Sequence, residues 1–374
     1  MSSESVEVRP VETKKAWRDF VTFPYKHYKD NPCWVPPLLM DQKVLLDPQK
    51  HPFYEHAKAQ FFLARKKGKP AGRIAAIVDE KHNEFHQEKT GFFGFFEAIE
   101  EYEVAEKLLT AARNWVKNQG MERFRGPVNP SQNEDCGLLI DAFDASPVIM
   151  MPYNLPYYAD LLEQFGLTKA MDLYAYYIDD KNPPPEKLVR VAEAVRKREK
   201  LTVRPIEMKN FDEEARKVWY VFNNAWSKNW GFVPMTKNEF AHLAKNLKQV
   251  VVPEIALMAE IDGKPVGFSL SLPDVNQALL RLNGRLFPTG LLKLLWYSRK
   301  IDMIRIIIMG VIHEYQKHGI DAIFYLDTWR NATQRGYWRG EMSWILENNE
   351  MMNRSARMLG GRIYKTYRMY EMKL

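Results

Sequence analysis

Cysteine is almost absent from this chain of 374 residues: Cys33 and Cys136 are the only two, and they lie far apart. Small secreted scaffolds depend on several disulfides, and zinc ribbons depend on paired cysteines, so the sequence excludes both classes and we expect no metal centre. Isolated thiols are typical of a reducing compartment. We therefore expect a cytoplasmic protein without structural disulfides.

Long hydrophobic runs are also missing. The longest strongly apolar run, Ile306–Ile312, is far shorter than the ~20 residues that a helix needs to cross a bilayer. The first residues, Met1–Val11, are polar, so we expect no secretory signal. What is present is ordinary globular material, 46% hydrophobic and 27% charged. At roughly 100–200 residues per domain, the length predicts two or three domains.

Excess positive charge is confined to the second half of the chain. Residues 1–185 hold 23 Lys and Arg against 27 Asp and Glu, a balance of −4, whereas residues 186–374 hold 31 against 20, a balance of +11. The overall charge of +7 therefore combines an acidic half with a strongly basic half. A basic half indicates a polyanionic partner: a phosphorylated cofactor, an anionic lipid surface or a nucleic acid.

Three consecutive prolines, Pro183–Pro185, separate these halves. Proline lacks a backbone donor and favours an extended spacer, so this segment is typical of a linker. We expect an N-terminal domain over residues 1–180, a linker over 181–186 and a C-terminal domain over 187–374.

The two halves share a pattern of landmarks. An apolar run, a Gly- and Pro-containing turn and a second apolar run occur at residues 61–78 and again at 255–272, which predicts a β-hairpin in each half. Gly68 and Gly263 are 195 residues apart, and so are Asn154 and Asn349. Such a long period indicates a duplicated domain rather than a solenoid.

Each copy is predicted to contain helices, the hairpin, a third strand, a long helix, another strand, a short helix and a final strand. In copy one we expect the third strand at Gly91–Ile99, the long helix at Glu103–Gln119 and the next strand at Val148–Met151. In copy two we expect the third strand at Ile304–Ile312 and a helix that begins near Gly319. The fold class is therefore α/β, with a mixed sheet flanked by helices in each copy.

The segment Met309–Ala322 resembles the strand-to-helix element of the GNAT acyltransferase superfamily, in which Gln/Arg-x-x-Gly-x-Gly/Ala follows an apolar strand. Gln316 and Gly319 match this motif, whereas Asp321 occupies the second small position. The resemblance implies that backbone N–H groups of the loop and the helix N-terminus bind the pyrophosphate of acyl-CoA, because unpaired donors and a positive dipole end face a dianion. The cofactor-binding residues implied are Met309, Val311, Gln316, Lys317, His318, Gly319, Ile320, Asp321 and Ala322.

A second part of the resemblance lies after the next strand, where the family has Asn, then Tyr seven residues later and Gly eleven residues later. Asn349 and Gly360 fit this spacing, but Ala356 stands at the tyrosine position. The resemblance implies that Asn349 contacts pantetheine or closes the turn. The tyrosine that relatives use to protonate the departing thiolate is absent there, so Tyr315, Tyr337 or a water would replace it.

Over most of residues 20–374 the chain is similar to a bacterial group of tandem-GNAT proteins that includes proteins similar to bacterial ceramide synthase. The segments that carry this resemblance are Phe124–Ser131, Met150–Asn154, Asn229–Pro234 and Glu341–Asn348. It implies transfer of an acyl group from acyl-CoA, or from an acyl carrier protein, to an amine. A lipid such as a sphingoid base is one candidate acceptor, and coenzyme A would be released.

Copy one resembles a GNAT fold without the cofactor loop. Between its third strand and its long helix lie four carboxylates, Glu97, Glu100, Glu101 and Glu103, which would repel a pyrophosphate. We therefore predict that copy two alone binds CoA. Copy one would be a scaffold or one wall of the acceptor cleft.

Attack on a thioester requires a neutral amine, a donor to the oxyanion and a proton for the leaving thiolate. Glu341 and Glu347 lie on one face of the strand beside the cofactor strand, because alternate residues of a strand point the same way. Either glutamate is a candidate base, as is His313 just past the cofactor strand; the alternative for each glutamate is a surface ion pair. A backbone N–H near Val311 would stabilise the oxyanion.

Two further segments of copy two are rich in aromatic residues. Trp226, Asn229, Trp230 and Phe232 lie where GNAT folds place the acceptor-side helices, so the resemblance implies an apolar acceptor pocket there; core packing is the alternative. Residues 273–303 interleave leucines and aromatics with basic residues. That pattern is typical of contact with an anionic membrane surface or of a lid over an acyl chain, and a core helix is the alternative.

Two other functions stay open at this point. Some peptidoglycan-branching enzymes with tandem GNAT-like domains use aminoacyl-tRNA, and a basic half suits tRNA, although the sequence lacks the sustained heptads of their coiled-coil arm. A non-catalytic GNAT-like binding protein would explain Asp321 and Ala356. We favour an acyltransferase in the cytoplasm or on the cytoplasmic face of the membrane. No nucleic-acid partner is expected, since zinc-finger spacing and RNP-like strands are absent from the sequence.

Overall fold

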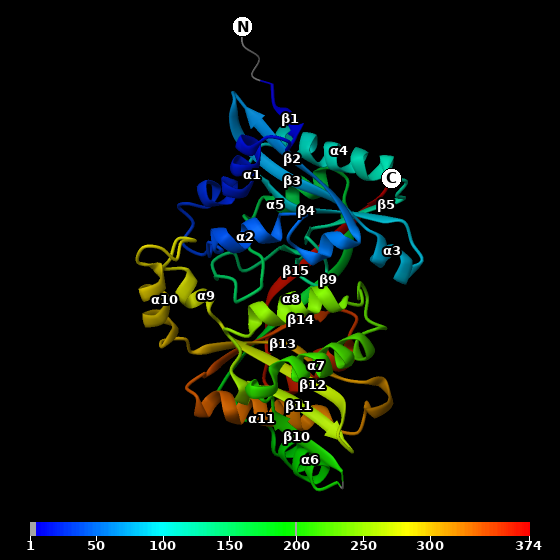
Figure 1. Cartoon of the computed structure of the whole chain (residues 1–374), viewed down its shortest axis with the longest axis vertical. Helices are drawn as coiled ribbons and strands as arrows, with labels where there is room; N and C mark the ends of the chain where they lie inside the picture. Colours follow the sequence, from blue (N-terminus) through cyan, green and yellow to red (C-terminus); the bar gives the residue numbers. More distant parts are fainter. Residues whose placement is uncertain (1–4, 199) are drawn as a thin grey trace. The chain divides into compact units, whose positions relative to one another are not determined.

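The computed structural model describes residues 5–198 and 200–374 (Figure 1). The contacts between residues divide it into two compact units. Unit 1 comprises Met1–Leu173, Leu279–Leu294 and Lys365–Leu374. Unit 2 comprises Tyr174–Ala278 and Leu295–Tyr364. Strands and helices alternate along both, so the α/β fold class is confirmed.

A mixed sheet forms the centre of unit 1, with strands in the order β1-β2-β3-β4-β5-β15-β9. Neighbours from β1 to β4 are antiparallel, and β4 runs parallel to β5. Helix α4 packs on β2, β3 and β4, and α1 packs on β2 and β3. The strands are β1 (Glu7–Pro10), β2 (Ala57–Lys66), β3 (Lys69–Asp79), β4 (Thr90–Ala98), β5 (Arg123–Gly126), β6 (Val128–Asn129), β7 (Asp135–Cys136), β8 (Leu138–Leu139), β9 (Thr168–Asp179) and β15 (Arg362–Lys373). The helices are α1 (Lys14–His27), α2 (Leu39–Leu45), α3 (Glu80–His86), α4 (Tyr102–Asn118) and α5 (Tyr158–Gln164).

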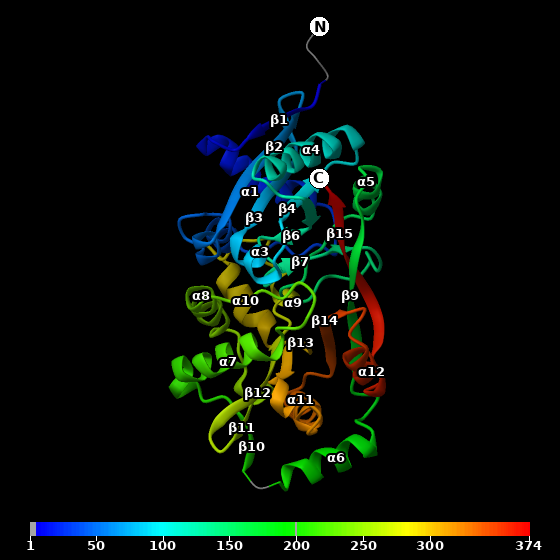
Figure 2. The same ribbon diagram turned by 90° about the vertical axis from the view of Figure 1, so that its right-hand side faces the viewer.

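Unit 2 contains a second sheet region, with strands in the order β9-β14-β13-β12-β11-β10. Figure 2 shows α7 on one face of β12 and β13 and α11 on the other, and both helices contact these strands. Helix α6 packs against α11. The strands are β10 (Leu201–Pro205), β11 (Ala256–Ile261), β12 (Lys264–Pro273), β13 (Met303–Val311) and β14 (Arg339–Leu346). The helices are α6 (Glu186–Arg196), α7 (Phe211–Ala225), α8 (Lys237–Leu247), α11 (Ile320–Gln334) and α12 (Glu350–Met358).

The order of elements is the same in the two copies. In copy one it is β2-β3-β4-α4-β5-α5-β9, and in copy two it is β11-β12-β13-α11-β14-α12-β15. The predicted hairpins, third strands and long helices are therefore confirmed, and α11 begins directly after Gly319. The buried face of α4 includes Val104, Leu108, Ala112 and Val116, as its helical spacing predicts.

The last strand of each copy pairs with strands of the other copy. β15, which ends copy two, is antiparallel to β5 and β8 in unit 1. β9, which ends copy one, lies next to β14 in unit 2. The contact units therefore differ from the division of the sequence at residues 181–186, and that division stays a prediction about independently folding domains. Helix α6 begins at Glu186, directly after the three prolines.

One predicted strand is wrong. Val148–Met151 forms no strand: it is irregular and contains a turn, in which Met150 has a φ of 57°. The physical reason is local, because Pro147 and Pro152 flank the segment and neither can donate to a strand ladder. The strand that follows the long helix of copy one is β5 instead.

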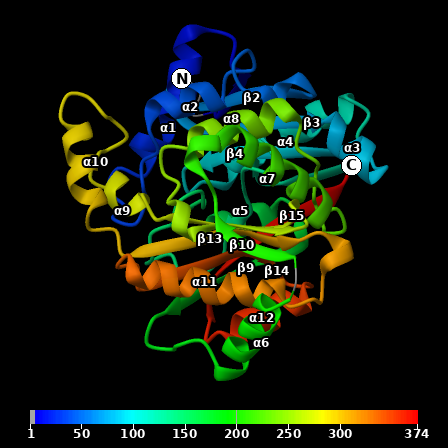
Figure 3. The ribbon, with the colours of Figure 1, turned by 60° about the horizontal axis from the view of Figure 1, so that its bottom comes forward.

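Hydrophobic burial accounts for the long helices. Helix α11 buries residues on several sides because it lies between the sheet and α6, and its buried residues include Ile320, Ile323, Phe324 and Leu326. Within residues 5–198 and 200–374, no helix combines the length and the apolar character that crossing a membrane requires. Figure 3 shows α11 along β13. Two short helices, α9 (Asn276–Leu279) and α10 (Gly290–Ser298), lie between β12 and β13 in the sequence.

Candidate active site

The neighbouring parallel strands β13 and β14 separate along their length. Their pairing runs from Met303 opposite Arg339 to Ile306 opposite Met342, and ends there, although both strands continue. Beyond this point the two strands no longer bond each other, and the carbonyl of Ser343 instead accepts a hydrogen bond from the buried Arg305 at 3.3 Å. A small cleft lies at this divergence. It is lined by Trp226, Asn229, Ile306, Ile307, Met309, Tyr325, Met342, Ser343, Trp344, Ile345, Leu346, Asn349 and Met352.

The lining of the cleft comes from both faces of the sheet. Trp226 and Asn229 follow helix α7 on one face, whereas Tyr325 of α11 and Met352 of α12 lie on the other. Trp226 lies against the backbone of β13, since a Cβ on Gly310 would come within 2.3 Å of its ring. Two reactants that approach from opposite faces can therefore meet in this cleft.

Two of the four predicted acceptor residues line the cleft, namely Trp226 and Asn229. Phe232 is buried and packs against Phe222 with the ring centroids 5.5 Å apart. Trp230 is half-buried. Neither Trp230 nor Phe232 is among the described residues that line the cleft, and for Phe232 the core-packing alternative fits the structure.

The loop between β13 and α11 is held in shape by side chains. Gln316 donates from Nε2 to the carbonyl of Val311 at 3.1 Å, and its Oε1 lies 3.1 Å from Nδ1 of His313. Lys228 Nζ lies 2.9 Å from the other ring nitrogen of His313. Arg198 donates to the carbonyl of His318 at 2.8 Å. The predicted motif residue Gln316 therefore fixes the loop, and His313 is part of that exposed hydrogen-bond chain.

The end of this loop is the N-terminus of helix α11. Gly319 is the N-cap of α11, with a φ of +81°, and a Cβ there would come within 2.8 Å of Val195. In the described part of the chain, no side chain caps this helix, so the N–H groups of its first turn face outward without a side-chain acceptor. Lys317 beside them is exposed and adds a positive charge. Asp321, in the first turn, is exposed to solvent, where its negative charge is screened.

Asn349 has the turn-closing role considered for it. Its Oδ1 accepts a hydrogen bond from the backbone N–H of Met352 at 3.2 Å, which caps helix α12. The same residue lines the cleft. Ala356, at the position of the missing tyrosine, is buried in the core of unit 2.

Glu341 is fully buried beneath the cleft wall. Its carboxylate accepts hydrogen bonds from the hydroxyls of Ser343 and Tyr364. Ser343 lines the cleft, and its Oγ also accepts from Nε of the buried Arg305 at 3.0 Å. Glu341 therefore communicates with the cleft through Ser343.

The other two candidate bases lie elsewhere. Glu347 follows the last residue of β14 and is half-buried, and its carbonyl accepts a hydrogen bond from Asn353 at 3.4 Å. His313 is exposed and belongs to the loop described above. The structure thus places Glu341, Glu347 and His313 at three separate points: behind the cleft wall, past the strand end and in the loop.

Tyr325 is a cleft residue that the sequence analysis missed. It lies on α11 and points toward α12, where its hydroxyl lies 3.6 Å from Sδ of Met352. Burial, with a smaller effect from Asp321, raises the pKa of Tyr325 to about 12, although a hydrogen bond with Ser355 opposes the shift. The hydroxyl thus lies beside α12 next to Ala356. No family spacing indicates it, because it comes from a different helix.

The corresponding place in copy one is filled by the chain itself. β4 pairs with β5 only from Thr90 to Phe92, and strand β6 then takes the space. A Cβ on Gly94 would lie 1.6 Å from the carbonyl oxygen of Val128. The amide of Phe95 donates to Oδ1 of Asn129 at 2.5 Å. These contacts place β6 against β4 at the position that corresponds to the cleft of copy two.

Three of the four carboxylates predicted at this end of copy one are paired, namely Glu97, Glu101 and Glu103. Glu97 bonds Nε of Arg73 at 2.6 Å, and burial raises its pKa despite that cation. Glu103 bonds Lys107 at 2.7 Å. Only residues 99–101 connect β4 with α4, whereas 312–319 connect β13 with α11. A loop able to surround a phosphate is therefore built in copy two.

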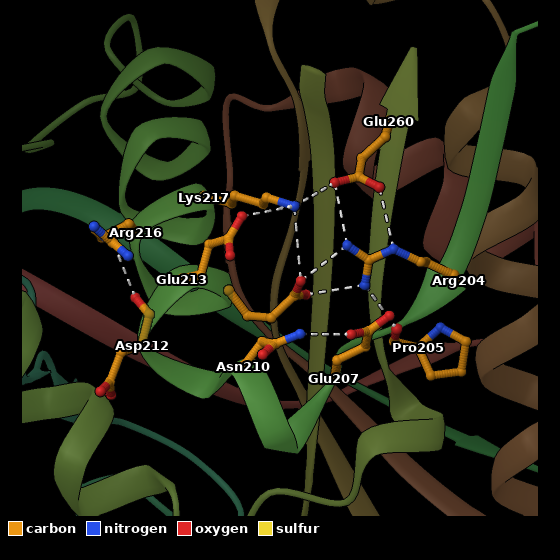
Figure 4. A network of polar contacts seen from close by, with 10 residues as sticks. Arg204, Pro205, Glu207, Asn210, Asp212, Glu213, Arg216, Lys217 and Glu260 are labelled. Carbon is orange, nitrogen blue, oxygen red and sulfur yellow. Dashed lines mark hydrogen bonds and ion pairs between the residues drawn. The ribbon is translucent and has the colours of Figure 1, made fainter. Parts of the chain in front are cut away.

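A buried ion network anchors helix α7, which leads to Trp226 (Figure 4). Arg204 of β10 binds both Glu214 of α7, at 2.9 Å, and Glu260 of β11, at 3.1 Å. Lys217 of α7 binds Glu260 at 2.8 Å. Glu214 is buried, so its charge depends on these partners. In the described residues, no cluster of three or more His, Cys, Asp or Glu side chains is arranged to hold a metal ion.

Comparisons with known proteins agree with this geometry. No family model matches the chain. The chain is 38% identical to Protein YghO of Escherichia coli (strain K12) over 98% of this chain and 95% of that protein. It is 35% identical to bacterial ceramide synthase of Caulobacter vibrioides (strain NA1000 / CB15N) over 100% of this chain and 99% of that protein.

Solved structures show the same fold. A tandem GNAT protein from the clavulanic acid biosynthesis pathway superposes with a TM-score of 0.58 at 10% identity, covering 99% of this chain and 98% of that one. A GCN5-related glucosamine N-acetyltransferase region of a fungal multi-domain β-N-acetylglucosaminidase gives 0.60 at 15% identity, covering 100% of this chain and 38% of that one. The chain therefore belongs to the tandem-GNAT family that includes bacterial ceramide synthase, and it is an acyltransferase.

Proposed function

We propose that this protein transfers an acyl group from acyl-CoA, or from an acyl carrier protein, to the amine of a long-chain acceptor such as a sphingoid base. The observation that carries the proposal is the cleft at the divergence of β13 and β14, which is lined by residues from both faces of the sheet. The printed name of the Caulobacter relative supports a lipid amine as acceptor.

The donor would be held by the loop before α11. Backbone N–H groups at the start of α11, with Lys317 and His318, would bind the pyrophosphate of coenzyme A. The pantetheine arm would enter the cleft beside Met309 and Asn349 and bring the thioester between the two strands. The acceptor would approach from the other face, past Trp226 and Asn229.

The buried polar groups supply a path for protons. The attacking amine gives a proton to Ser343 Oγ, which passes its own proton to the Glu341 carboxylate as the new N–C bond forms. The C–S bond then breaks, and the Tyr325 hydroxyl protonates the departing thiolate. Among the three candidate bases we therefore assign Glu341, because Ser343 connects its carboxylate to the cleft.

Donor binding is tested by calorimetry with hexadecanoyl-CoA on the full chain. Lys317→Glu should weaken binding about ten- to a hundredfold, because it replaces a charge-assisted contact with repulsion. The matched control is Lys187→Glu on α6, an exposed lysine outside the loop. Equal affinity of both variants would remove the loop from the donor site.

The reaction is tested by following amide formation from hexadecanoyl-CoA, or hexadecanoyl acyl carrier protein, and sphinganine. Glu341→Gln should lower kcat at least a hundredfold, whereas Glu347→Gln and His313→Gln should keep it. No amide with either donor would refute the proposed function. An amide formed only from aminoacyl-tRNA would establish the tRNA-dependent alternative, and ligand binding without turnover would indicate a binding protein.

The sequence predicts a membrane contact within residues 273–303, and α10 with the residues just before it exposes several large apolar side chains. Here Phe287 is 77% exposed, Leu292 71%, Leu295 59% and Trp296 60%. Basic residues on the same segment include Arg285, Lys293, Arg299 and Lys300. We propose that this segment rests on an anionic membrane surface at the cytoplasmic face, where apolar side chains enter the headgroup region and cations pair with phosphates.

Flotation with vesicles tests this contact. The protein should float with phosphatidylglycerol-containing vesicles and not with purely zwitterionic ones. Leu292→Glu should abolish flotation, whereas Met351→Glu, at an equally exposed apolar residue on α12, should not. Flotation that is the same for both variants would rule out α10 as the contact.

A further inference from the structure

A guanidinium group lies in the interior of unit 2, next to residues that line the cleft. It belongs to Arg305 of β13, whose side chain is only 1% exposed. A charge removed from water lowers stability unless it is paired and hydrogen-bonded, so this arginine requires specific partners. In the parallel pairing of β13 with β14, Arg305 stands opposite Glu341, which is also fully buried. A cation and an anion are therefore buried together at this position.

Arg305 bonds the residue at which the pairing of β13 with β14 stops. The pairing ends at Met342, and Ser343 is the next residue of β14. Arg305 donates from Nε to Oγ of Ser343 at 3.0 Å and from a terminal nitrogen to the carbonyl of the same residue at 3.3 Å. Its guanidinium carbon lies 5.0 Å from the centre of the Trp344 ring. Because Ser343 and Trp344 both line the cleft, one buried side chain holds two consecutive residues of the cleft wall.

The chemistry of these groups fixes the direction of the Ser343 hydroxyl. A guanidinium can only donate hydrogen bonds, and an ionised carboxylate can only accept them. Ser343 therefore accepts from Arg305 and donates its own proton to Oε1 of Glu341. The other carboxylate oxygen of Glu341 accepts from the hydroxyl of Tyr364. Without the arginine, the serine hydroxyl would be free to rotate toward other acceptors.

We propose that Arg305 is a positioning residue of the acyltransferase, which keeps the Ser343 hydroxyl directed at Glu341 and balances the charge of that carboxylate inside the protein. The proposal rests on the proposed function, in which the proton of the attacking amine leaves through Ser343. Arg305 is not among the described residues that line the cleft, so it acts through Ser343 and not on a substrate. Its loss should therefore lower kcat and leave substrate binding intact.

The test measures kcat and KM for amide formation from hexadecanoyl-CoA and sphinganine. Arg305→Met keeps a long side chain but removes the charge and the donors, so kcat should fall about a hundredfold while KM for both substrates stays within about twofold. Arg305→Lys keeps a cation that can only donate, and it should recover about tenfold of that loss.

The matched control is Arg73→Met in unit 1. Arg73 is also buried, and its guanidinium likewise bonds a carboxylate, that of Glu97, and a backbone carbonyl, that of Phe20. The control variant should lose stability but keep the kcat of wild type.

A double-variant cycle separates positioning from structural support. The double variant that combines Arg305→Met with Glu341→Gln removes the cation and the anion together, so it should fold even where Arg305→Met alone is unstable. Residues that act as one unit have non-additive effects on catalysis. The kcat of the double variant should therefore equal that of Glu341→Gln.

Two results would overturn the role of Arg305. One is wild-type kcat in Arg305→Met, and the other is a kcat in the double variant that lies below that of Glu341→Gln by the full effect of Arg305→Met. Either result would leave acyl transfer by the wild-type protein intact. A wild-type protein that forms no amide from hexadecanoyl-CoA or from hexadecanoyl acyl carrier protein would instead refute the proposed function.

Discussion

Buried polar side chains in the cleft determine what chemistry it can perform. Glu341 is fully buried and bonded on both carboxylate oxygens, and Ser343 stands between it and the cleft. Tyr325 supplies a hydroxyl on the donor side, where Ala356 supplies none. A buried carboxylate and a phenol thus lie near one cleft, although the family tyrosine is missing.

Replacement of the Tyr325 hydroxyl should reveal its role. Tyr325→Phe keeps the ring in place and removes the proton donor, so kcat should fall about 10²- to 10⁴-fold with little change in affinity for acyl-CoA. Because the pKa of Tyr325 is about 12, this group stays protonated up to pH 10 and should cause no loss of wild-type activity below that pH. Steady-state kinetics from pH 7 to 10 measure both effects.

Tyr220→Phe on the exposed surface of α7 is the control for this substitution. It should keep full activity. If Tyr325→Phe also keeps wild-type kcat, the proton for the thiolate comes from another group, such as a water.

Helix α7, which leads to the cleft, is held in place by ion pairs that lie away from the cleft. Helix α7 is fixed to β10 and β11 through Arg204, Glu214 and Glu260, and it delivers Trp226 and Asn229 to the cleft. The hydrogen bond that Arg204 donates to Glu214 raises the pKa of Arg204. For Glu260, burial would raise the pKa, but hydrogen bonds from Lys217 and Arg204 lower it overall.

Loss of Arg204 should loosen this helix. Arg204→Leu leaves the buried Glu214 carboxylate without its main partner and should lower the free energy of unfolding by about 3 kcal/mol. Urea denaturation measures this change. Lys200→Leu, in an exposed ion pair with Asp262, is the control and should cost less than about 1 kcal/mol.

The same ion network predicts how the stability of the protein depends on pH. The folded pKa of Glu260 lies below its unfolded value, so its contribution to stability is present above the ordinary glutamate pKa and is lost as the pH falls through the folded value. Wild type should therefore lose more stability than Glu260→Gln between neutral pH and the folded pKa of that carboxylate. Parallel stability curves for the two proteins would contradict this account.

At the scale of the whole molecule, the last strand belongs to the first unit. Residues 365–374 group with unit 1, where β15 pairs with β5 and β8. Tyr370 is fully buried in the core of that unit, and its hydroxyl donates to Glu163 at 2.9 Å. The two copies in the sequence are therefore not the two units in space.

A destabilising substitution in β15 should therefore weaken unit 1, although most of that unit comes from the first half of the chain. Tyr370→Ala should cost about 3–5 kcal/mol. Hydrogen exchange should become faster in β5 and β8 of unit 1, with little change in β11 and β12 of unit 2. Ile363→Ala, at an exposed residue of the same strand, is the control. Loss of protection confined to β11 and β12 would contradict the strand pairing.

Local sequence patterns were sufficient to predict most elements of this protein. The hairpins, β13, α4 and the start of α11 follow from apolar periodicity and glycine position, which are short-range properties of the chain. The strand predicted at Val148–Met151 does not form, because apolar content alone does not make a strand between two prolines. For the site, the loop motif and Asn349 were predicted from spacing, and Trp226 and Asn229 from their place in the fold.

The sequence by itself determined the duplicated α/β fold, the acyltransferase family and the asymmetry between an acidic first copy and a basic second copy, because composition and spacing are visible in one dimension. Only the tertiary structure decided which strands pair, that the Tyr325 hydroxyl of α11 lies against Met352 of α12, and that Ser343 lines the cleft and bonds the buried Glu341. These depend on residues brought together by packing of distant elements, and no local spacing encodes that proximity.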